Sequence, residues 1–332
     1  MAVNPSDDAA IEVDGLRKSY PRFRPSGRRK LRPSDDVTWA VKGLSLHVRR
    51  GEIFAFLGPN GAGKTTTVEI MEGFRRRDGG DVRVLGVDPE RGDRDWRARI
   101  GIVLQEGRAQ PELTVRETLE LWTAYYPRPK PVAETIALVG LGEKADDRVA
   151  RLSGGQRRRL EVGLALTGDP DLIFLDEPTT GFDPVARRAA WSVIAGLRDL
   201  GKTVFLTTHY LDEAQELADR VAIIKAGVIV AEGAPGSLGA GSATVTEIAF
   251  VAPAGIDVRE IPVPAPAIDV AADGIARIRT DLPTRVLAEL CGWAAGRGIE
   301  LERLEVTRPT LEDVYLELVQ SDEPEPAPAG AA

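Results

Sequence analysis

The sequence predicts an α/β fold, in which helices cover a mostly parallel sheet, followed by a small α+β domain. Short apolar runs alternate with helical stretches up to about residue 230, which is the pattern of a parallel sheet with crossover helices. A Gly/Ala/Ser-rich linker follows at 231–243, and the composition changes after it. With 332 residues the chain is also longer than one average domain. We therefore expect a first domain at 1–235, a second at 244–319 and a disordered tail at 320–332.

The elements of the first domain follow from its apolar runs and from the stretches between them. Buried strands are expected at Ile53–Leu57, Ile100–Leu104, Leu172–Leu175, Val204–Thr207 and Val221–Ile224. Helices are expected at Lys64–Glu72 and Pro184–Leu200. A basic insert at 21–35, rich in Arg, Pro and Gly, has the composition of an exposed loop. It is either a solvated loop or a contact to anionic lipid or a membrane partner.

The second domain is expected to combine strands with helices at Pro283–Arg297 and Thr310–Val319. The last helix has an apolar face with the spacing i, i+3, i+4 and i+7, formed by Leu311, Val314, Tyr315 and Leu318. This face is either a stripe that packs on the core or a docking face for a partner.

Composition excludes several classes of protein. The 43 Lys and Arg against 51 Asp and Glu give a net charge of −8, which argues against bulk nucleic-acid binding. A single cysteine, Cys291, forbids an internal disulfide, and two histidines are too few for a structural zinc site. No uncharged apolar run approaches the roughly 18 residues that span a bilayer. The acidic N-terminus has no apolar signal-peptide core, so a soluble intracellular protein is expected.

Residues 58–65 read GPNGAGKT and fit the pattern G-x-x-x-x-G-K-[ST] between a predicted strand and helix. Glycines allow backbone N–H groups to converge on phosphate oxygens. Lys64 supplies a positive charge for the β- and γ-phosphates, and the Thr65 hydroxyl can bind Mg²⁺. A nucleoside triphosphate is therefore predicted to bind here. The residues assigned to this site are Gly58, Pro59, Asn60, Gly61, Ala62, Gly63, Lys64, Thr65 and Thr66.

The base of the nucleotide is predicted to be adenine. The guanine-reading motif N-K-x-D cannot occur, because the chain has asparagine only at positions 4 and 60. ATP is therefore favoured over GTP.

The run LIFLDE at 172–177 predicts a buried strand that ends in two carboxylates at the carboxyl edge of the sheet. Asp176 would hold Mg²⁺ directly or through water, and Glu177, on the opposite pleat, would activate the attacking water as general base. His209 ends the strand TVFLTTH at the same edge, where it could contact the γ-phosphate and the water. The simpler alternative is a strand that stops at a charged turn.

Residues 152–156 read LSGGQ and precede a basic amphipathic helix, which makes a second anion-binding helix N-terminus. Ser153 lies 89 residues after Lys64 and 23 residues before Asp176. One nucleotide already accounts for the first phosphate loop, so a second phosphate clamp is unexplained for a monomer.

With these motifs in this order, the chain resembles the nucleotide-binding subunit of ATP-binding cassette (ABC) transporters. More narrowly, it resembles the drug-resistance and ABC-2 type ATPases that work with a separate membrane permease, over residues 11 to about 235. The resemblance implies a P-loop NTPase cassette with a mostly parallel sheet core, an antiparallel β subdomain and an α-helical signature subdomain. It also implies a head-to-tail dimer, in which Ser153, Gly154, Gly155 and Gln156 of one copy contact the γ-phosphate bound by the other.

Further segments are similar to landmarks of that family. Gln105 after IGIVLQ resembles the glutamine that touches Mg²⁺ and the attacking water, Asp183 in TTGFDP the D-loop aspartate, and His209 the switch histidine. Tyr20 in LRKSY resembles the aromatic residue that stacks on adenine, although Trp39 is the alternative because the basic insert separates Tyr20 from the next strand. The resulting catalytic residues are Glu177, His209 and Gln105, and the resulting Mg²⁺ ligands are Thr65, Gln105 and Asp176.

The resemblance also implies cofactors, partners and location. It implies ATP and Mg²⁺, a second copy of the chain and an integral membrane permease, with no nucleic acid. The stretch ELTVRETLELWTAYY resembles the segment that contacts the permease, and RPTLEDVYLEL resembles the end of small domains attached to drug-resistance cassettes. We therefore expect a peripheral ATPase at the cytoplasmic face of the cell membrane that powers export of a drug, lipid or other hydrophobic compound. A soluble ABC-type ATPase without a transport role is the alternative.

Overall fold

The computed structural model describes residues 8–26, 30–103, 109–236, 238, 246–253, 256, 261–263, 268–270, 274–307 and 311–320. The chain divides into two compact units, Met1–Pro235 and Gly236–Ala332. The first is called the cassette unit and the second the C-terminal unit. Among the described residues, no helix combines the length and the apolar character needed to cross a bilayer.

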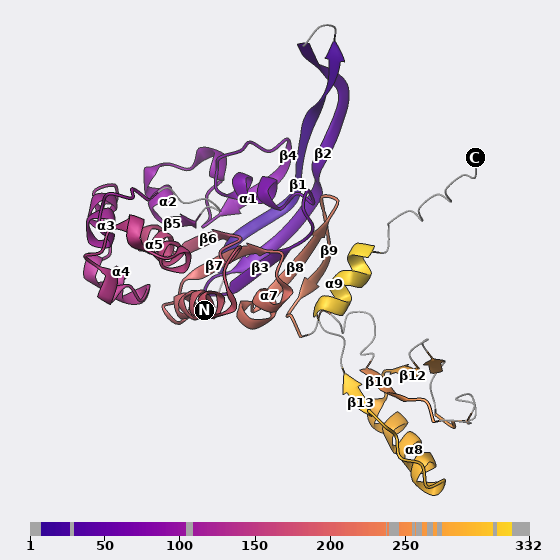
Figure 1. The fold of residues 1–332 in the computed structure, drawn as a ribbon. Coiled ribbons are helices and arrows are strands. Elements are labelled where there is room, and N and C mark those ends of the chain that lie inside the picture. Colours follow the sequence, from indigo (N-terminus) through magenta and orange to yellow (C-terminus); the bar gives the residue numbers. More distant parts are fainter. Residues whose placement is uncertain are drawn as a thin grey trace, which may run out of the picture. The chain divides into compact units, whose positions relative to one another are not determined.

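A mostly parallel sheet forms the centre of the cassette unit (Figure 1). Its strands are β3 (Ile53–Leu57), β5 (Ile100–Val103), β6 (Leu172–Asp176), β7 (Thr203–Thr208), β8 (Arg220–Lys225) and β9 (Val228–Gly233). They run in the order β5-β6-β7-β3-β8-β9, and only the β8–β9 pair within this order is antiparallel. The predicted α/β class is confirmed.

A second, antiparallel sheet consists of β1 (Ala9–Ser26), β2 (Lys30–Arg49) and β4 (Gly79–Val84), in the order β2-β1-β4. The prediction of a loop at 21–35 is wrong, because β1 and β2 continue into this insert and pair from Phe23–Pro33 to Ser26–Lys30. The two strands extend beyond the sheet as a long hairpin (Figure 1). Proline and glycine suggested a loop, but a two-stranded ribbon tolerates proline wherever the missing N–H would face outward.

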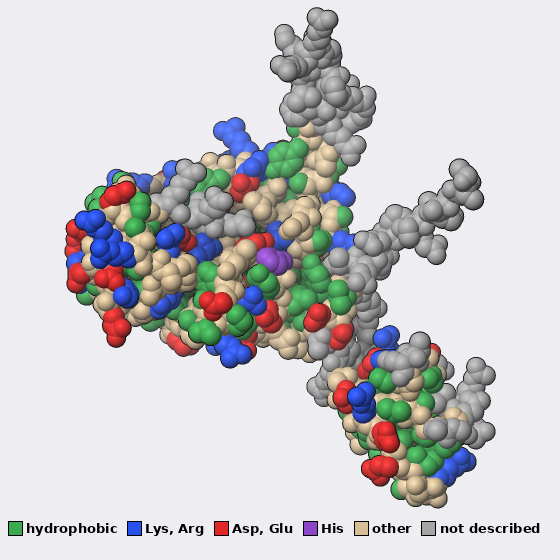
Figure 2. All heavy atoms as spheres, viewed as in Figure 1, with side chains coloured by type: hydrophobic (Ala, Val, Ile, Leu, Met, Phe, Trp, Pro, Cys, Tyr) green, Lys and Arg blue, Asp and Glu red, His purple; other side chains and the backbone are tan. Residues whose placement is uncertain are grey.

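The helices of the cassette unit cover the central sheet and form a separate group at its β5 end. They are α1 (Lys64–Met71), α2 (Arg94–Ala98), α3 (Val115–Thr123), α4 (Val132–Leu138), α5 (Gly154–Leu166), α6 (Pro184–Asp199) and α7 (Leu211–Leu217). Single 3₁₀ turns lie at Pro89–Arg91, Gly142–Lys144 and Val149–Arg151. Helices α3, α4 and α5 pack on one another, and α5 also packs on β5 (Figure 1). On the face shown in Figure 2, basic and acidic side chains are interspersed over this helical group.

Phenylalanine side chains connect three neighbouring strands in the core. The ring of Phe205 in β7 lies 5.6 Å from the rings of Phe54 and Phe56 in β3 and 5.7 Å from the ring of Phe174 in β6, measured between centroids. All four side chains are buried. Tilted and offset contacts of this kind stabilise a core beyond the burial of apolar area alone. They hold together the strands whose carboxyl ends carry the predicted site.

The C-terminal unit contains an antiparallel sheet of its own, with a helix packed on it. Its elements are β10 (Thr246–Val251), β11 (Ile268–Val270), β12 (Ile275–Thr280), α8 (Pro283–Gly296), β13 (Glu305–Thr307) and α9 (Leu311–Gln320). The strand order is β11-β12-β10-β13. Phe250 and Ile278 of the sheet form one buried cluster with Val286 and Leu290 of α8.

Three predictions concern the ends of these segments. The predicted linker at 231–243 begins too early, because Ala231–Gly233 belong to β9. On α9, Leu311 is buried while Val314, Tyr315 and Leu318 are half-buried. The helix includes Gln320, and the rest of the predicted tail, 321–332, lies outside the described residues.

Candidate functional site

The glycine-rich loop at 58–65 joins the end of β3 to the start of α1. A Cβ on Gly58 would lie 2.4 Å from the carbonyl oxygen of Ile224 in β8, and a Cβ on Gly63 would lie 2.4 Å from that of Ala40 in β2. Gly63 also has a φ of 109°, which side chains disfavour. No side chain fits at either position, so the backbone itself forms the surface of the loop.

The first turn of α1 follows this loop directly. Its N-cap residue, Gly63, has no side chain to bond the first N–H groups, and the first turn contains no acidic residue. The Thr65 side chain is exposed, and that of Thr66 is half-buried. Backbone N–H groups at a helix N-terminus, together with the helix dipole, attract an anion. The loop and α1 therefore fit a phosphate group.

Lys64 is held over the loop by its own backbone. Its Nζ donates to the carbonyl oxygen of Gly58 at 2.6 Å and to that of Pro59 at 3.2 Å. The side chain is buried, and this desolvation lowers the pKa of Lys64, while the charges of Glu177 and Asp176 act in the opposite direction. The ammonium group thus lies in the electrostatic field of the two carboxylates at the end of β6.

The end of β6 brings Asp176, Glu177 and His209 together. Thr207 of β7 donates a hydrogen bond from its Oγ1 to Asp176 Oδ1. His209 Nδ1 lies 3.3 Å from Glu177 Oε1, and the Thr180 hydroxyl donates to Glu177 Oε2 at 3.1 Å. Glu177 therefore has a neighbour on each carboxylate oxygen. The carboxylate is oriented, as a general base must be.

The backbone of Glu177 differs from the prediction that placed this residue on the opposite pleat of the strand. β6 ends at Asp176, and Glu177 has a φ of 45°, in the left-handed region. Such a conformation costs a non-glycine residue about 1–3 kcal/mol unless its surroundings enforce it. Here the Glu177 N–H donates to both the carbonyl oxygen and Oγ1 of Thr207, each at 3.1 Å. The turn, rather than the pleat, aims the carboxylate at His209.

Glu72, directly after α1, is a carboxylate that the sequence reasoning did not single out. Burial raises its pKa to about 8, and the charges of Asp176 and Glu69 add to this effect. Its carboxyl group is therefore largely protonated at neutral pH. The helical spacing of Lys64, Val68 and Glu72 places them on one face, which is the signal that could have revealed its burial.

The LSGGQ segment forms the start of α5. Ser153 is the N-cap residue: its Oγ accepts from the Gln156 N–H at 3.3 Å, and the Ser153 N–H donates to Gln156 Oε1 at 2.9 Å. This capping box fixes the helix start. A Cβ on Gly155 would lie 3.2 Å from the Cβ of Ala186 in α6, so a larger residue there would be tightly packed against α6. In Figure 1, α5 and α1 lie apart, so the two helix N-termini are separate features of one chain.

The next two predicted site residues are Asp183 and Gln105. Asp183 caps α6, because its Oδ1 accepts from the N–H groups of Val185 and Ala186, both at 2.9 Å. The resemblance to the D-loop aspartate implied a role for Asp183 at the nucleotide, and in this structure its contacts are those of an N-cap. Gln105 lies outside the described residues.

Tyr20 and Trp39 lie on adjacent strands of the hairpin near the phosphate loop. Tyr20 Oη lies 3.2 Å from Thr66 Oγ1 in α1, and the guanidinium of Arg75 lies 5.3 Å from the centre of its ring. Trp39 pairs with Ser19 in the register and is 43% exposed. The contact with Thr66 places Tyr20 beside the phosphate loop.

Alanine substitutions distinguish the two aromatic residues. We expect Tyr20→Ala to weaken ATP binding about fivefold, since one aromatic stacking contact contributes about 1 kcal/mol. Tyr20→Phe keeps the ring and should retain the affinity, and Trp39→Ala should leave it unchanged. The measurement is the Kd for a fluorescent ATP analogue. A loss from Trp39→Ala alone would move the contact to Trp39, and no loss from either alanine variant would contradict both assignments.

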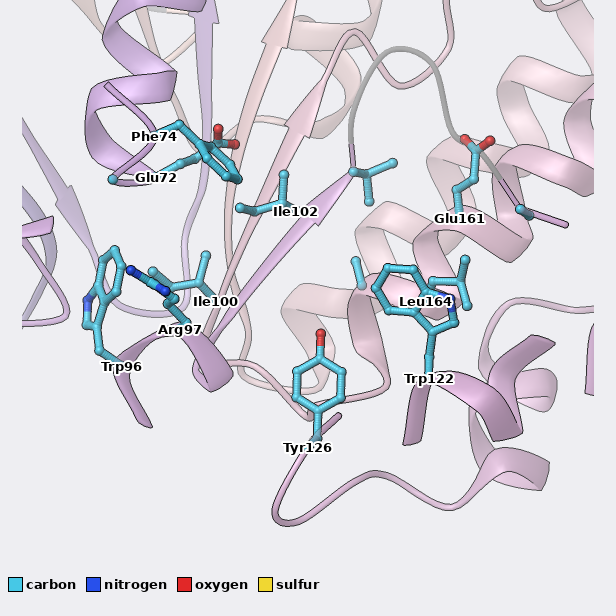
Figure 3. Close-up of a pocket in the computed structure, with 14 residues that line it drawn as sticks. Glu72, Phe74, Trp96, Arg97, Ile100, Ile102, Trp122, Tyr126, Glu161 and Leu164 are labelled. Atoms are coloured by element: carbon cyan, nitrogen blue, oxygen red, sulfur yellow. The ribbon is translucent and has the colours of Figure 1, made fainter. Parts of the chain in front are cut away.

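A pocket of about 920 Å³ lies between β5, the end of α1 and the helical group. Figure 3 shows the rings of Phe74, Trp122 and Tyr126 arranged around Ile102 of β5. Phe74 is 70% exposed and Trp122 is 41% exposed. The carboxyl groups of Glu72 and Glu161 also line the pocket. Exposed aromatic side chains around a concave surface are typical of a binding site for a partner or ligand.

The sequence of this chain is similar to those of known proteins. A family model described as ABC transporter matches residues 41–180, and one described as the C-terminal domain of ABC transporter domain-containing protein-like proteins matches residues 246–310. Nod factor export ATP-binding protein I of Paraburkholderia xenovorans is 42% identical over 236 residues, which cover 70% of this chain and 73% of that protein. The chain belongs to the ABC transporter family. It is an ATP-binding cassette with ATPase activity.

A second similar protein matches nearly the whole chain, and a solved structure matches about two thirds of it. Daunorubicin resistance ATP-binding protein DrrA3 of Streptomyces coeruleorubidus is 35% identical over 326 residues, which are 95% of this chain and 97% of that protein. A structure described as the dimeric structure of MJ0796, a bacterial ABC transporter cassette, superposes with a TM-score of 0.56 and 25% identity. It covers 68% of this chain and 98% of that chain. The similarity to the resistance protein thus extends over both units.

Proposed function

We propose that this ABC cassette is the ATP-hydrolysing subunit of an exporter and works as a head-to-tail dimer with a separate ABC-2 type permease. The observation that carries the proposal is the pairing of an oriented carboxylate, Glu177, with a phosphate loop and a separate glycine-rich helix N-terminus at Ser153. The similar proteins are named for Nod factor export and daunorubicin resistance. These names support a role in export, and a drug, lipid or other hydrophobic compound is the cargo that we propose.

In the proposed mechanism, the phosphate loop and Lys64 hold the triphosphate, and Glu177 accepts a proton from the attacking water. His209 keeps the Glu177 carboxylate in place and contacts the γ-phosphate. Mg²⁺, held by the hard oxygen ligands of Thr65, Asp176 and Gln105, would neutralise phosphate charge when bound. The field of Asp176 at Lys64 supports a common site for these groups.

The dimer is proposed because one chain offers two helix N-termini suited to phosphate. Ser153, Gly154, Gly155 and Gln156 of one copy would complete the site that the other copy's loop begins. Asp183 of the same subunit would lie at this interface. The similar cassette whose structure is described as dimeric supports this arrangement. ATP would draw the two copies together, and hydrolysis would release them.

The membrane partner is proposed to bind the aromatic pocket beside β5. Its wall includes Trp122 of α3, within the segment that resembles the permease contact, and the exposed ring of Phe74. Buried aromatic anchors dominate binding energy at protein interfaces. The ATPase would then be a peripheral protein at the cytoplasmic face of the membrane. A soluble ABC-type ATPase without a transport role is the competing function.

A six-helix permease encoded beside the gene for this protein would be the candidate partner, and co-expression with it would test the proposal. The wild-type protein should be recovered with membranes only when the permease is present. We expect Trp122→Asp to weaken binding to the permease about 30-fold or more, and so to lower this recovery, because removing an interface anchor costs at least about 2 kcal/mol.

Leu200→Asp is the matched control, since Leu200 is similarly exposed, at 46%, and does not line the pocket. It should behave as wild type. Membrane recovery that ignores the permease, or that survives Trp122→Asp, would favour the soluble ATPase or a different docking surface.

A further inference from the structure

One arginine of α5 holds the backbone on both sides of Glu177. Arg158 Nη2 donates to the carbonyl oxygen of Asp176 at 2.9 Å, and its Nε donates to that of Pro178 at 3.1 Å. These two carbonyls belong to the residues immediately before and after Glu177. Arg158 is 7% exposed, so water has little access to either hydrogen bond.

The guanidinium is itself held in place by a carboxylate. Arg158 Nη1 lies 2.8 Å from Glu161 Oε2, one helical turn further along α5. Their side chains are 8% and 11% exposed, so the pair is nearly buried. An arginine fork with three such partners has a fixed position, which lysine cannot reproduce with its single ammonium group.

Glu177 needs support of this kind because its backbone is in the left-handed region, with a φ of 45°. A non-glycine residue stays there only when neighbouring groups enforce the conformation. Thr207 fixes its N–H from the β7 side, and Arg158 fixes the two flanking carbonyls from the α5 side. If these carbonyls were released, the peptide could relax and turn the carboxylate away from His209.

We propose that Arg158 is a positioning residue that ties helix α5 to the catalytic glutamate of its own subunit. The same helix starts after its N-cap Ser153, so a phosphate bound there by the partner copy acts on a helix that Arg158 connects to the backbone on both sides of Glu177. The inference rests on the proposed dimer and on Glu177 as the base. Each copy thus aligns its own general base in response to the nucleotide that the other copy presents.

The test uses the full-length protein with Arg158→Lys and with the double variant Arg158→Met/Glu161→Leu. The double variant removes both charges, so no unpaired ion is left buried. We expect its kcat to fall about 100-fold, the size of loss that a misplaced catalytic group causes. The lysine variant should lie between it and wild type. The Kd for ATP should stay within about twofold, because the hydrogen bonds of Arg158 to Asp176, Pro178 and Glu161 are made outside the phosphate loop.

Arg157→Met is the matched control, because Arg157 is exposed on the same helix and its loss removes the same charge. It should keep wild-type turnover. The dependence of rate on ATP concentration provides the second readout: wild type should show a Hill coefficient above 1, and the Arg158 variants should approach 1. Circular dichroism confirms that each variant is folded.

Wild-type turnover in the double variant would overturn the inference, and so would equal losses in kcat and in ATP affinity. An unchanged Hill coefficient would contradict the link between the two sites. The single variant Glu177→Gln separates this inference from the proposed function. If Glu177→Gln is inactive while the Arg158 variants turn over normally, only the role of Arg158 fails; an active Glu177→Gln refutes the base assignment itself.

Discussion

Replacing Glu177 by glutamine is expected to lower the rate of ATP hydrolysis by about 10²–10⁴-fold, because an amide cannot accept a proton from water. The substitution is nearly isosteric and keeps an oxygen that can accept from Thr180, whose hydroxyl donates to the carboxylate at 3.1 Å. ATP binding should therefore remain. Since the nucleotide would then hold the two copies together without being consumed, an ATP-dependent dimer should accumulate. Phosphate release and light scattering measure the two effects.

Glu143→Gln is the control for this experiment. Glu143 is an exposed carboxylate of the same ABC cassette, outside the proposed site, and its loss should change neither the rate nor the assembly state. A Glu177→Gln protein that hydrolyses ATP at the wild-type rate would rule out Glu177 as the general base. A Glu177→Gln protein that is inactive and stays monomeric with saturating ATP would contradict the proposed ATP-dependent dimer.

Replacing Ser153 by arginine should lower turnover about 100-fold while leaving ATP affinity in the variant's own phosphate loop unchanged. The long side chain would block the approach of the partner's phosphate to the start of α5, and loss of preorganised donors at a reacting centre has effects of this size. Ser153→Thr keeps the hydroxyl that accepts from the Gln156 N–H and should retain activity. The measurements are kcat and the Kd for ATP.

Mixing two inactive proteins distinguishes a site shared by two copies from a site within one. Lys64→Ala disables the phosphate loop, and Ser153→Arg disables the helix start. In a mixed head-to-tail dimer, the intact phosphate loop of the Ser153→Arg protein faces the intact LSGGQ segment of the Lys64→Ala protein. One complete site therefore forms. Hydrolysis should partly recover on mixing. No recovery at any ratio would contradict the head-to-tail dimer.

The sequence predicts the central sheet well because its strands are short apolar runs with clear boundaries. β3 coincides with the predicted Ile53–Leu57, β6 is longer than predicted by one residue at one end, and β7 is longer by one residue at each end. In a parallel sheet both faces are covered, so burial leaves a continuous apolar signal in the sequence. The carboxyl-edge location of the candidate site follows from that pattern alone.

The basic insert shows why local composition was insufficient elsewhere. Its proline and glycine content indicated a loop, but β1 and β2 pair through it from Phe23 to Ser26. Strand pairing is a property of two segments together, and one segment's residue preferences do not reveal it. The register of a hairpin therefore has to be observed.

Geometry around Glu177 was equally inaccessible to sequence reasoning. A strict strand alternation placed this residue on the opposite pleat, whereas the chain turns there with a positive φ. The groups that enforce the turn, Thr207 and Arg158, come from β7 and α5, 30 and 19 residues away along the chain. Long-range hydrogen bonds of this kind leave no periodic signature. Motifs predicted that Asp176, Glu177 and His209 lie at one edge of the sheet, and the structure shows how they are oriented.

The way the phosphate loop is seated affects how nucleotide binding and folding depend on each other. Gly63 lies against the carbonyl oxygen of Ala40 in β2, and Gly58 lies against that of Ile224 in β8, so the loop is packed between two sheets. Because the loop packs against both sheets, we expect a fragment lacking either one to hold ATP less tightly. Nucleotide would then protect the whole cassette against unfolding rather than one local segment, because it binds only the fully assembled state.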